Sequence, residues 1–168
     1  MCVAVDSNCM HAMQYERVSE TEGAATAALH HILETSYIAL DSGQLCAQEW
    51  LDCMPGPFGE EVRGWIDTLI VKQKIRLLDL PSCPVLIKKV SQDGLPKKDQ
   101  KWVKLCMHNC VKFLVTEDID FFDPKLKKAT TASKQDTKNK LSGDMRKLIR
   151  RETGAEVICL NHVPTYEL

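Results

Sequence analysis

Acidic side chains follow two apolar segments that the sequence predicts to be strands. Residues 111–115 form one segment, and Asp118 and Asp120 come directly after it in a turn that holds no Lys or Arg. Residues 3–5 form the other segment, and Asp6 follows it. Ligands of open α/β sheets sit at the carboxyl ends of the strands, so these acids are expected to form one cluster. Carboxylates are the ligands that Mg²⁺ and Mn²⁺ prefer, and the sequence therefore predicts a divalent-metal site.

Two further acids extend this pattern. Glu49 lies on a predicted helix after the second strand, and Asp99 begins the helix that leads into residues 111–115. The chain thus has an Asp at a strand end, a Glu on an early helix, an Asp at a later helix start, and a Thr-x-Asp-x-Asp-Phe motif after a strand. This order resembles the PIN-domain nuclease family over nearly the whole chain, and the last motif is the most specific part of the resemblance.

The resemblance implies both a reaction and a set of site residues. PIN-domain proteins are α/β/α sandwiches that hydrolyse RNA at an acidic Mg²⁺ or Mn²⁺ site, and many are toxins of toxin–antitoxin pairs. It thus implies a metal-dependent ribonuclease, with single-stranded DNA as an alternative substrate. An antitoxin, another regulatory protein or a second copy of the chain are the protein partners left open. The implied catalytic acids are Asp6, Glu49, Asp99 and Asp118, and the implied metal ligands are Asp6, Asp99, Asp118 and Asp120.

The chemistry of phosphodiester hydrolysis suits these residue types. The reaction needs an activated water and stabilisation of negative charge on the phosphoryl oxygens, and hard cations held by several carboxylates supply both. Asn8 and Thr116 are expected to orient the phosphate or the metal ligands. Simpler roles stay open for each acid, since Asp99 could cap its helix, Asp118 could stabilise a turn and Glu49 could be a surface residue. Auxiliary or rival acids are Glu34 and Asp41, which compete with Glu49, and Asp123, which could be a ligand or a turn former.

The charge of the chain is unevenly distributed. Residues 124–151 carry ten Lys and Arg against two acids, whereas the rest of the chain carries twelve against twenty-one. This basic segment is either a polyanion-binding arm or a solvated helix face. The first interpretation also supports an alternative function, a catalytically inactive PIN-like module that binds RNA or a protein through the segment. The predicted nucleic-acid contacts are Asn8, Thr116, Lys134, Lys138, Arg146, Lys147, Arg150 and Arg151.

Strands that alternate with helices predict an α/β fold, a three-layer α/β/α sandwich around a mainly parallel sheet. The length of 168 residues fits one domain, residues 1–168. Residues 81–90 are ambiguous between helix and extended structure. The predicted strands are 3–5, 37–40, 75–80, 111–115 and 156–160, and the predicted helices are 21–36, 44–53, 60–73 and 97–109.

The cysteines and the apolar segments argue against several other classes of protein. The eight cysteines contain no Cys-x-x-Cys pair, so zinc-ribbon spacing is absent. The start of the chain lacks the pattern of a secretory signal, and no apolar run approaches the roughly 20 residues that a bilayer span requires. The sequence therefore predicts a cytoplasmic protein without a membrane partner.

Overall fold

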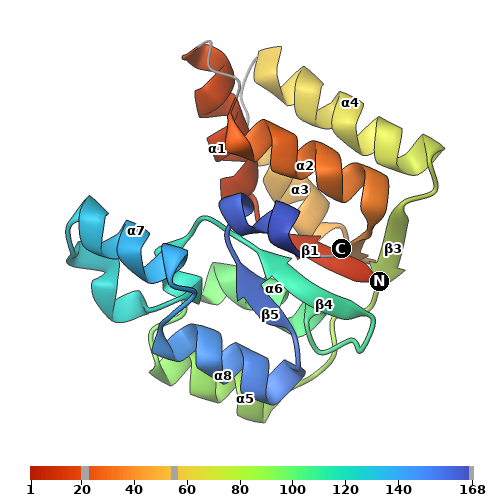
Figure 1. The fold of residues 1–168 in the computed structure, drawn as a ribbon. Helices are drawn as coiled ribbons and strands as arrows, with labels where there is room; N and C mark the ends of the chain where they lie inside the picture. The colour runs from red at the N-terminus through yellow and green to blue at the C-terminus, as the bar shows by residue number, and fades with distance from the viewer. Residues whose placement is uncertain (20–22, 54–56, 167–168) are drawn as a thin grey trace.

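Five parallel strands form the centre of the protein in this computed structural model, which describes residues 1–19, 23–53 and 57–166 (Figure 1). Their order across the sheet is β3-β2-β1-β4-β5, and every neighbouring pair is parallel. Because β1 lies in the middle of the sheet, all four of its side chains are buried. The strands are β1 (Cys2–Val5), β2 (Tyr37–Asp41), β3 (Ile75–Leu78), β4 (Val111–Val115) and β5 (Glu156–Ile158).

The register of the central strands brings their carboxyl ends to the same level. Val5 of β1 pairs with Val115 of β4, and Val115 in turn pairs with Ile158 of β5. The amide of Asp6 continues the ladder and donates to the carbonyl of Val115 at 2.9 Å. The residues that follow these strands therefore meet at one edge, which we call the carboxyl edge of the sheet.

Helices cover both faces of the sheet. In Figure 1, α1, α2 and α4 lie above the strands, whereas α5 and α8 lie below them. The prediction of a three-layer α/β/α sandwich is confirmed, and the sheet is wholly parallel. None of the helices described is long and apolar enough to cross a membrane. The α-helices are α1 (Asn8–Val18), α2 (Ala24–Thr35), α3 (Leu45–Asp52), α4 (Pro57–Val71), α5 (Pro84–Gln92), α6 (Gln100–Leu105), α7 (Thr131–Asn139) and α8 (Asp144–Thr153); the 3₁₀ helices are η1 (Lys97–Asp99), η2 (Ile119–Phe121), η3 (Pro124–Lys128) and η4 (Leu160–Thr165).

Most predicted elements agree with the structure to within a few residues, and the differences concern helices. The ambiguous residues 81–90 are largely helical, as α5. The predicted helix 97–109 is the short η1 followed by α6, which ends at Leu105. The sequence did not predict α1, α7 or α8, of which α7 buries none of its residues. Residues 21 and 22 of the predicted helix 21–36 lie outside the described residues.

A cluster of tryptophans fixes α3 against the carboxyl edge. The ring centroids of Trp50 and Trp102 lie 6.4 Å apart, and those of Trp50 and Trp65 lie 5.3 Å apart. The indole of Trp50 also donates to the carbonyl of Val5 at 2.9 Å, which satisfies a buried acceptor at the end of β1. This contact brings Glu49, the neighbour of Trp50 in the chain, to the same edge as Asp6.

Candidate metal centre

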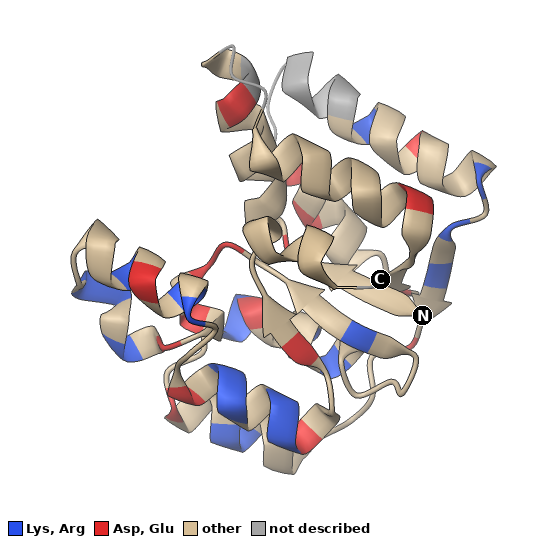
Figure 2. Cartoon of the chain, in the orientation of Figure 1, with Lys and Arg blue, Asp and Glu red and all other residues tan. Residues whose placement is uncertain are grey.

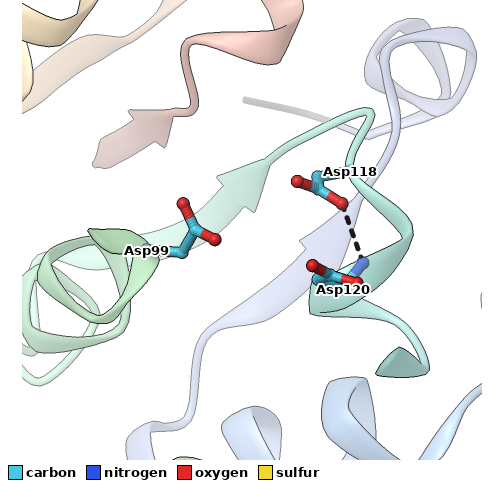
Figure 3. Close-up of side chains that lie close together, drawn as sticks. All are labelled: Asp99, Asp118 and Asp120. Atoms are coloured by element: carbon cyan, nitrogen blue, oxygen red, sulfur yellow. Dashed lines mark hydrogen bonds between the residues drawn. The ribbon is translucent and has the colours of Figure 1, made fainter. Parts of the chain in front are cut away.

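Three aspartates from separate parts of the chain meet at the carboxyl edge (Figure 3). Asp99 ends η1, whereas Asp118 and Asp120 lie in the turn after β4. One carboxylate oxygen from each lies within 4.8 Å of those of the other two. Asp99 and Asp120 are each only 2% exposed, and Asp118 is half-buried. This group could hold a metal ion, which supports the prediction of a metal site. The identity of the metal stays a prediction.

Two oxygens of this group have no hydrogen-bond partner. Within residues 1–19, 23–53 and 57–166, Oδ2 of Asp99 and Oδ1 of Asp120 are buried and accept no hydrogen bond. A buried carboxylate oxygen without a partner is costly, and a bound cation would remove that cost. The side chain of Asp99 makes no capping bond to α6, so its simpler role as a helix cap does not account for it. The unpartnered oxygens fit a metal ion.

Asp118 is both a turn former and a member of the site. Its Oδ1 accepts from the amide of Asp120 at 2.9 Å, which caps η2. Its Oδ2 lies 3.4 Å from the side-chain amide of Asn8 on α1. The amide of Asp118 donates to the hydroxyl of Thr116 at 3.0 Å. These contacts fix the carboxylate and leave further lone pairs on both oxygens for a cation.

Asp6 supports the three-aspartate group from the end of β1. Its fully buried carboxylate accepts from the hydroxyl of Thr116 at 2.7 Å, from the amide of Asn8 at 3.0 Å and from the hydroxyl of Ser7 at 3.3 Å. Asn8 and Thr116 thus connect Asp6 to Asp118. The structure places Asp6 beside the group rather than in it, and direct metal ligation by Asp6 stays a prediction.

The local electrostatics disfavour further negative charge. The pKa of Asp99 is raised to about 6, mainly by burial and also by the carboxylates of Asp6, Asp118 and Glu49, against the opposing effect of Lys98. Burial is also the main cause of the raised pKa of Asp6, which the bonds from Thr116 and Asn8 partly offset. A divalent cation would relieve this repulsion.

The structure distinguishes the three candidates for the acid on an early helix. Glu49 accepts from Ser7 Oγ at 2.9 Å and forms an ion pair with Lys101, which places it at the rim of the site. Asp41 instead accepts from the first two amides of α3, at 2.9 and 2.7 Å, and caps that helix. Glu34 is exposed near the end of α2, just before β2 begins, and so lies at the opposite edge of the sheet.

A lysine that the sequence did not single out contacts the site. Lys127 Nζ lies 2.9 Å from Oδ2 of Asp120, so an internal cation already neutralises part of the cluster. Asp123 accepts from the amide of Lys125 at 3.1 Å and caps η3, which is the turn-forming role among its two alternatives. Lys127 follows Asp120 by seven residues, and the contact forms because η3 packs against η2.

The helix α7 brings basic residues close to the aspartates. A cleft of about 300 Å³ next to Asp118 is lined by Asn8, Lys134 and Lys138, among others. Lys138 forms an ion pair with Glu117, which also accepts from the amide of Leu160 at 2.9 Å. Of the two lysines that line this cleft, Lys134 is therefore the one whose charge can bind a ligand.

The cations of α8 have acidic neighbours of their own (Figure 2). Arg146 and Arg150 both form ion pairs with Glu156, the first residue of β5. Because α8 ends just before β5 begins, its last turn lies at the edge of the sheet opposite the aspartates. Arg151 pairs with Glu152, and Lys147 lies 3.9 Å from Asp144. The structure thus brings Lys134 and Lys138, but not Arg150 or Arg151, to the candidate metal centre.

Comparisons with models of known protein families, with curated proteins and with solved structures found no match. The functional argument therefore depends on the fold and on the geometry of the metal centre.

Proposed function

We propose that the protein is a nuclease that hydrolyses phosphodiester bonds of RNA with Mg²⁺ or Mn²⁺ held by Asp99, Asp118 and Asp120. The observation that carries the proposal is the pair of buried, unpartnered oxygens on Asp99 and Asp120 within one three-aspartate group. The group offers only carboxylate oxygens, which favour hard cations over Zn²⁺, whose sites are commonly built from Cys and His. Its position at the carboxyl edge of a parallel sheet is where ligands of such folds bind.

The bound ion would activate a water and stabilise the charge that develops on the phosphoryl oxygens. The residues of the chain supply positioning. Asn8 donates to both Asp6 and Asp118, and so holds the ligand carboxylate in one orientation. The hydroxyl of Thr116 donates to Asp6 and accepts from the amide of Asp118, so its proton is used in a hydrogen bond within the protein and is not available to a substrate. Thr116 is therefore a positioning residue, whereas Asn8 also faces the cleft that Lys134 lines.

The inactive PIN-like binding module is the second candidate, and one observation favours it. Two acids of the site already have lysine partners, since Lys127 contacts Asp120 and Lys101 contacts Glu49. Internal cations of this kind could replace a metal ion in a protein that binds RNA without cutting it. Such a module would bind RNA equally well with and without Asp118, and no metal would produce cleavage.

A cleavage assay with Asp118→Asn tests the proposal. Wild-type protein is expected to cut single-stranded RNA with Mn²⁺ or Mg²⁺ and to stop in EDTA, and a DNA strand of the same sequence defines the sugar preference. Asp118→Asn removes a ligand charge with little change in volume, and rate losses of about a thousandfold or more are expected. Asp67→Asn, at an exposed position on α4, is the matched control.

Two results would contradict the proposal. Wild-type protein that cuts neither RNA nor DNA with any divalent metal would exclude the nuclease. An Asp118→Asn variant with more than about a tenth of the wild-type rate has lost under 1.4 kcal/mol, which is too little for a metal ligand. The toxin role implied by the family resemblance predicts that expression arrests cell growth and that Asp118→Asn abolishes the arrest.

A further inference from the structure

A row of lysines lines the molecule beside the candidate metal centre. Lys97, Lys98, Lys101 and Lys104 lie on η1 and α6, and we call them the lysine row. All four line a cavity of about 650 Å³. Lys98 and Lys101 also line a cavity of about 530 Å³, which extends to Asn8 at the metal centre. The two cavities share Lys98, Lys101 and Leu45, and we call them together the groove. The second cavity reaches Asn8, whose side-chain amide lies 3.4 Å from Oδ2 of Asp118.

Most of the positive charge of this row is available to a ligand. Lys97 and Lys98 are exposed and Lys104 is half-buried, and none of the three forms an ion pair with any residue that the structure describes. Among the described residues, Lys101 is the member of the row that pairs with a carboxylate, that of Glu49. Free lysines can neutralise phosphates without first breaking an internal pair, whereas the cations of α8 would have to exchange theirs.

The groove also has an apolar wall, which a purely ionic ligand would not need. Leu45 lines both cavities, and it is 56% exposed. Leu80 lines the larger cavity next to the lysines. Ligand cavities of this size commonly combine apolar walls with a few polar groups. Phosphates on the lysines and a base against the leucines would match the two kinds of surface.

The depth of the metal centre favours a single strand over a duplex. Asp99 and Asp120 are each 2% exposed, so they lie below the surface of the protein. A flexible strand can bend toward them, whereas a duplex is stiff on this length scale. Asn8 borders both the 530 Å³ cavity and the 300 Å³ cleft that Lys134 lines, so the strand can continue past the aspartates.

We propose that the lysine row is the binding track for single-stranded nucleic acid on one side of the scissile phosphate, with a nucleobase against Leu45 and Leu80. This inference rests on the proposed nuclease function and names its substrate-binding surface. The main phosphate contacts are then made by η1 and α6, whereas the composition of the sequence predicts them on α8. Lys134 contacts the strand on the other side of the metal centre.

Two triple variants that each remove three positive charges decide between these surfaces. The first replaces Lys97, Lys98 and Lys104 by Gln, and the second replaces Lys147, Arg150 and Arg151 by Gln. Binding of a fluorescent single-stranded RNA is measured by anisotropy over a range of salt concentrations. EDTA is present throughout, so that binding is measured without cleavage. A DNA strand of the same sequence and an RNA duplex serve as further probes, and thermal melts verify that both variants fold.

The lysine row predicts a clear difference between the two variants. The first is expected to bind at least tenfold more weakly, and the slope of log K against log salt should fall by about 2, since single strands release about 0.7 counterion per phosphate contact. The second is expected to change the slope less. Leu45→Ala is expected to weaken binding several-fold with an unchanged slope, because it removes an apolar contact and no charge.

Several results would overturn the inference without affecting the proposed function. One is an unchanged slope of log K against log salt in the variant of Lys97, Lys98 and Lys104. Another is an equal or larger loss of affinity in the variant of Lys147, Arg150 and Arg151. The third is a duplex that binds as tightly as the single strand. Cleavage with Mn²⁺ and its loss in Asp118→Asn are measured separately. The nuclease can thus stand while the lysine row fails, and single-strand binding by the lysine row can be measured even if no cleavage occurs.

Discussion

Replacing Asp99 by Asn should stabilise the metal-free protein, because the fold holds this carboxylate where its charge is unfavourable. Asp99 is buried, its Oδ2 has no hydrogen-bond partner among the described residues, and three other carboxylates repel it. Asn has nearly the same shape and carries no charge. The substitution should therefore relieve the repulsion in the folded state while changing the unfolded chain very little.

The magnitude follows from the pKa of Asp99. Burial raises this pKa from 3.8 to about 6, and a shift of roughly 2 units corresponds to about 3 kcal/mol. Because the folded-state pKa is the higher one, the cost is absent below about pH 4 and complete above about pH 6. The variant should thus gain about 3 kcal/mol over wild type at pH 7.5 and about half of that at pH 5.

Thermal melts in EDTA at pH 5 and pH 7.5 measure this gain. For a chain of this length 1 kcal/mol shifts Tm by roughly 2–4 °C, so Asp99→Asn should melt roughly 6–12 °C above wild type at pH 7.5 and less at pH 5. Added Mn²⁺ should reverse the relation. A ligand at 100 times its Kd stabilises the folded state by about 2.7 kcal/mol, and the variant should gain much less of this than wild type.

The melts can refute each part of the reasoning. If Asp99→Asn melts no higher than wild type in EDTA at pH 7.5, the buried carboxylate is not under electrostatic stress. If its advantage does not shrink toward pH 5, the gain has a cause other than the titration of Asp99. Equal shifts with Mn²⁺ in both proteins would mean that Asp99 holds no metal. Asp67→Asn, which removes an exposed charge on α4, should show none of these effects.

Two other substitutions test contacts next to the site. Lys127→Met should tighten Mn²⁺ binding about two- to fivefold, because the exposed ammonium 2.9 Å from the buried Asp120 competes with the metal; weaker binding in a Mn²⁺ titration of Tm would show that Lys127 positions Asp120 instead. Gly143→Ala should destabilise the protein by more than about 2 kcal/mol, because Gly143 has φ +119° and a Cβ there would lie 2.2 Å from the backbone oxygen of Phe122. Gly64→Ala on α4 has no atom within 4 Å of the added Cβ and should leave Tm equal or higher, and equal melting of the two variants would contradict the strain at Gly143.

The sequence by itself determined the fold class and the principal acids. Apolar runs that alternate with helical segments favour a parallel sheet, since the helices supply the crossovers that parallel strands need. Asp6 and Asp118 follow such runs directly, so their place at the carboxyl edge depends only on local sequence. Asp99 was also predictable, because it begins the helix that leads into β4. The approach of Asp6 to Asp118 further depended on the pairing of β1 with β4, which the structure shows.

Only the tertiary structure decided which partner each charged group has. Glu49 was the predicted acid and Asp41 a rival that the sequence left open, and the packing of α3 on β1 placed Glu49 at the site and made Asp41 a helix cap. Composition concentrated positive charge in residues 124–151, yet Arg150 pairs with Glu156 while Lys98, beside the aspartates, forms no ion pair with a residue that the structure describes. The physical reason is that electrostatic interactions depend on distances in space, and distances between segments far apart in the sequence exist only once the chain has folded.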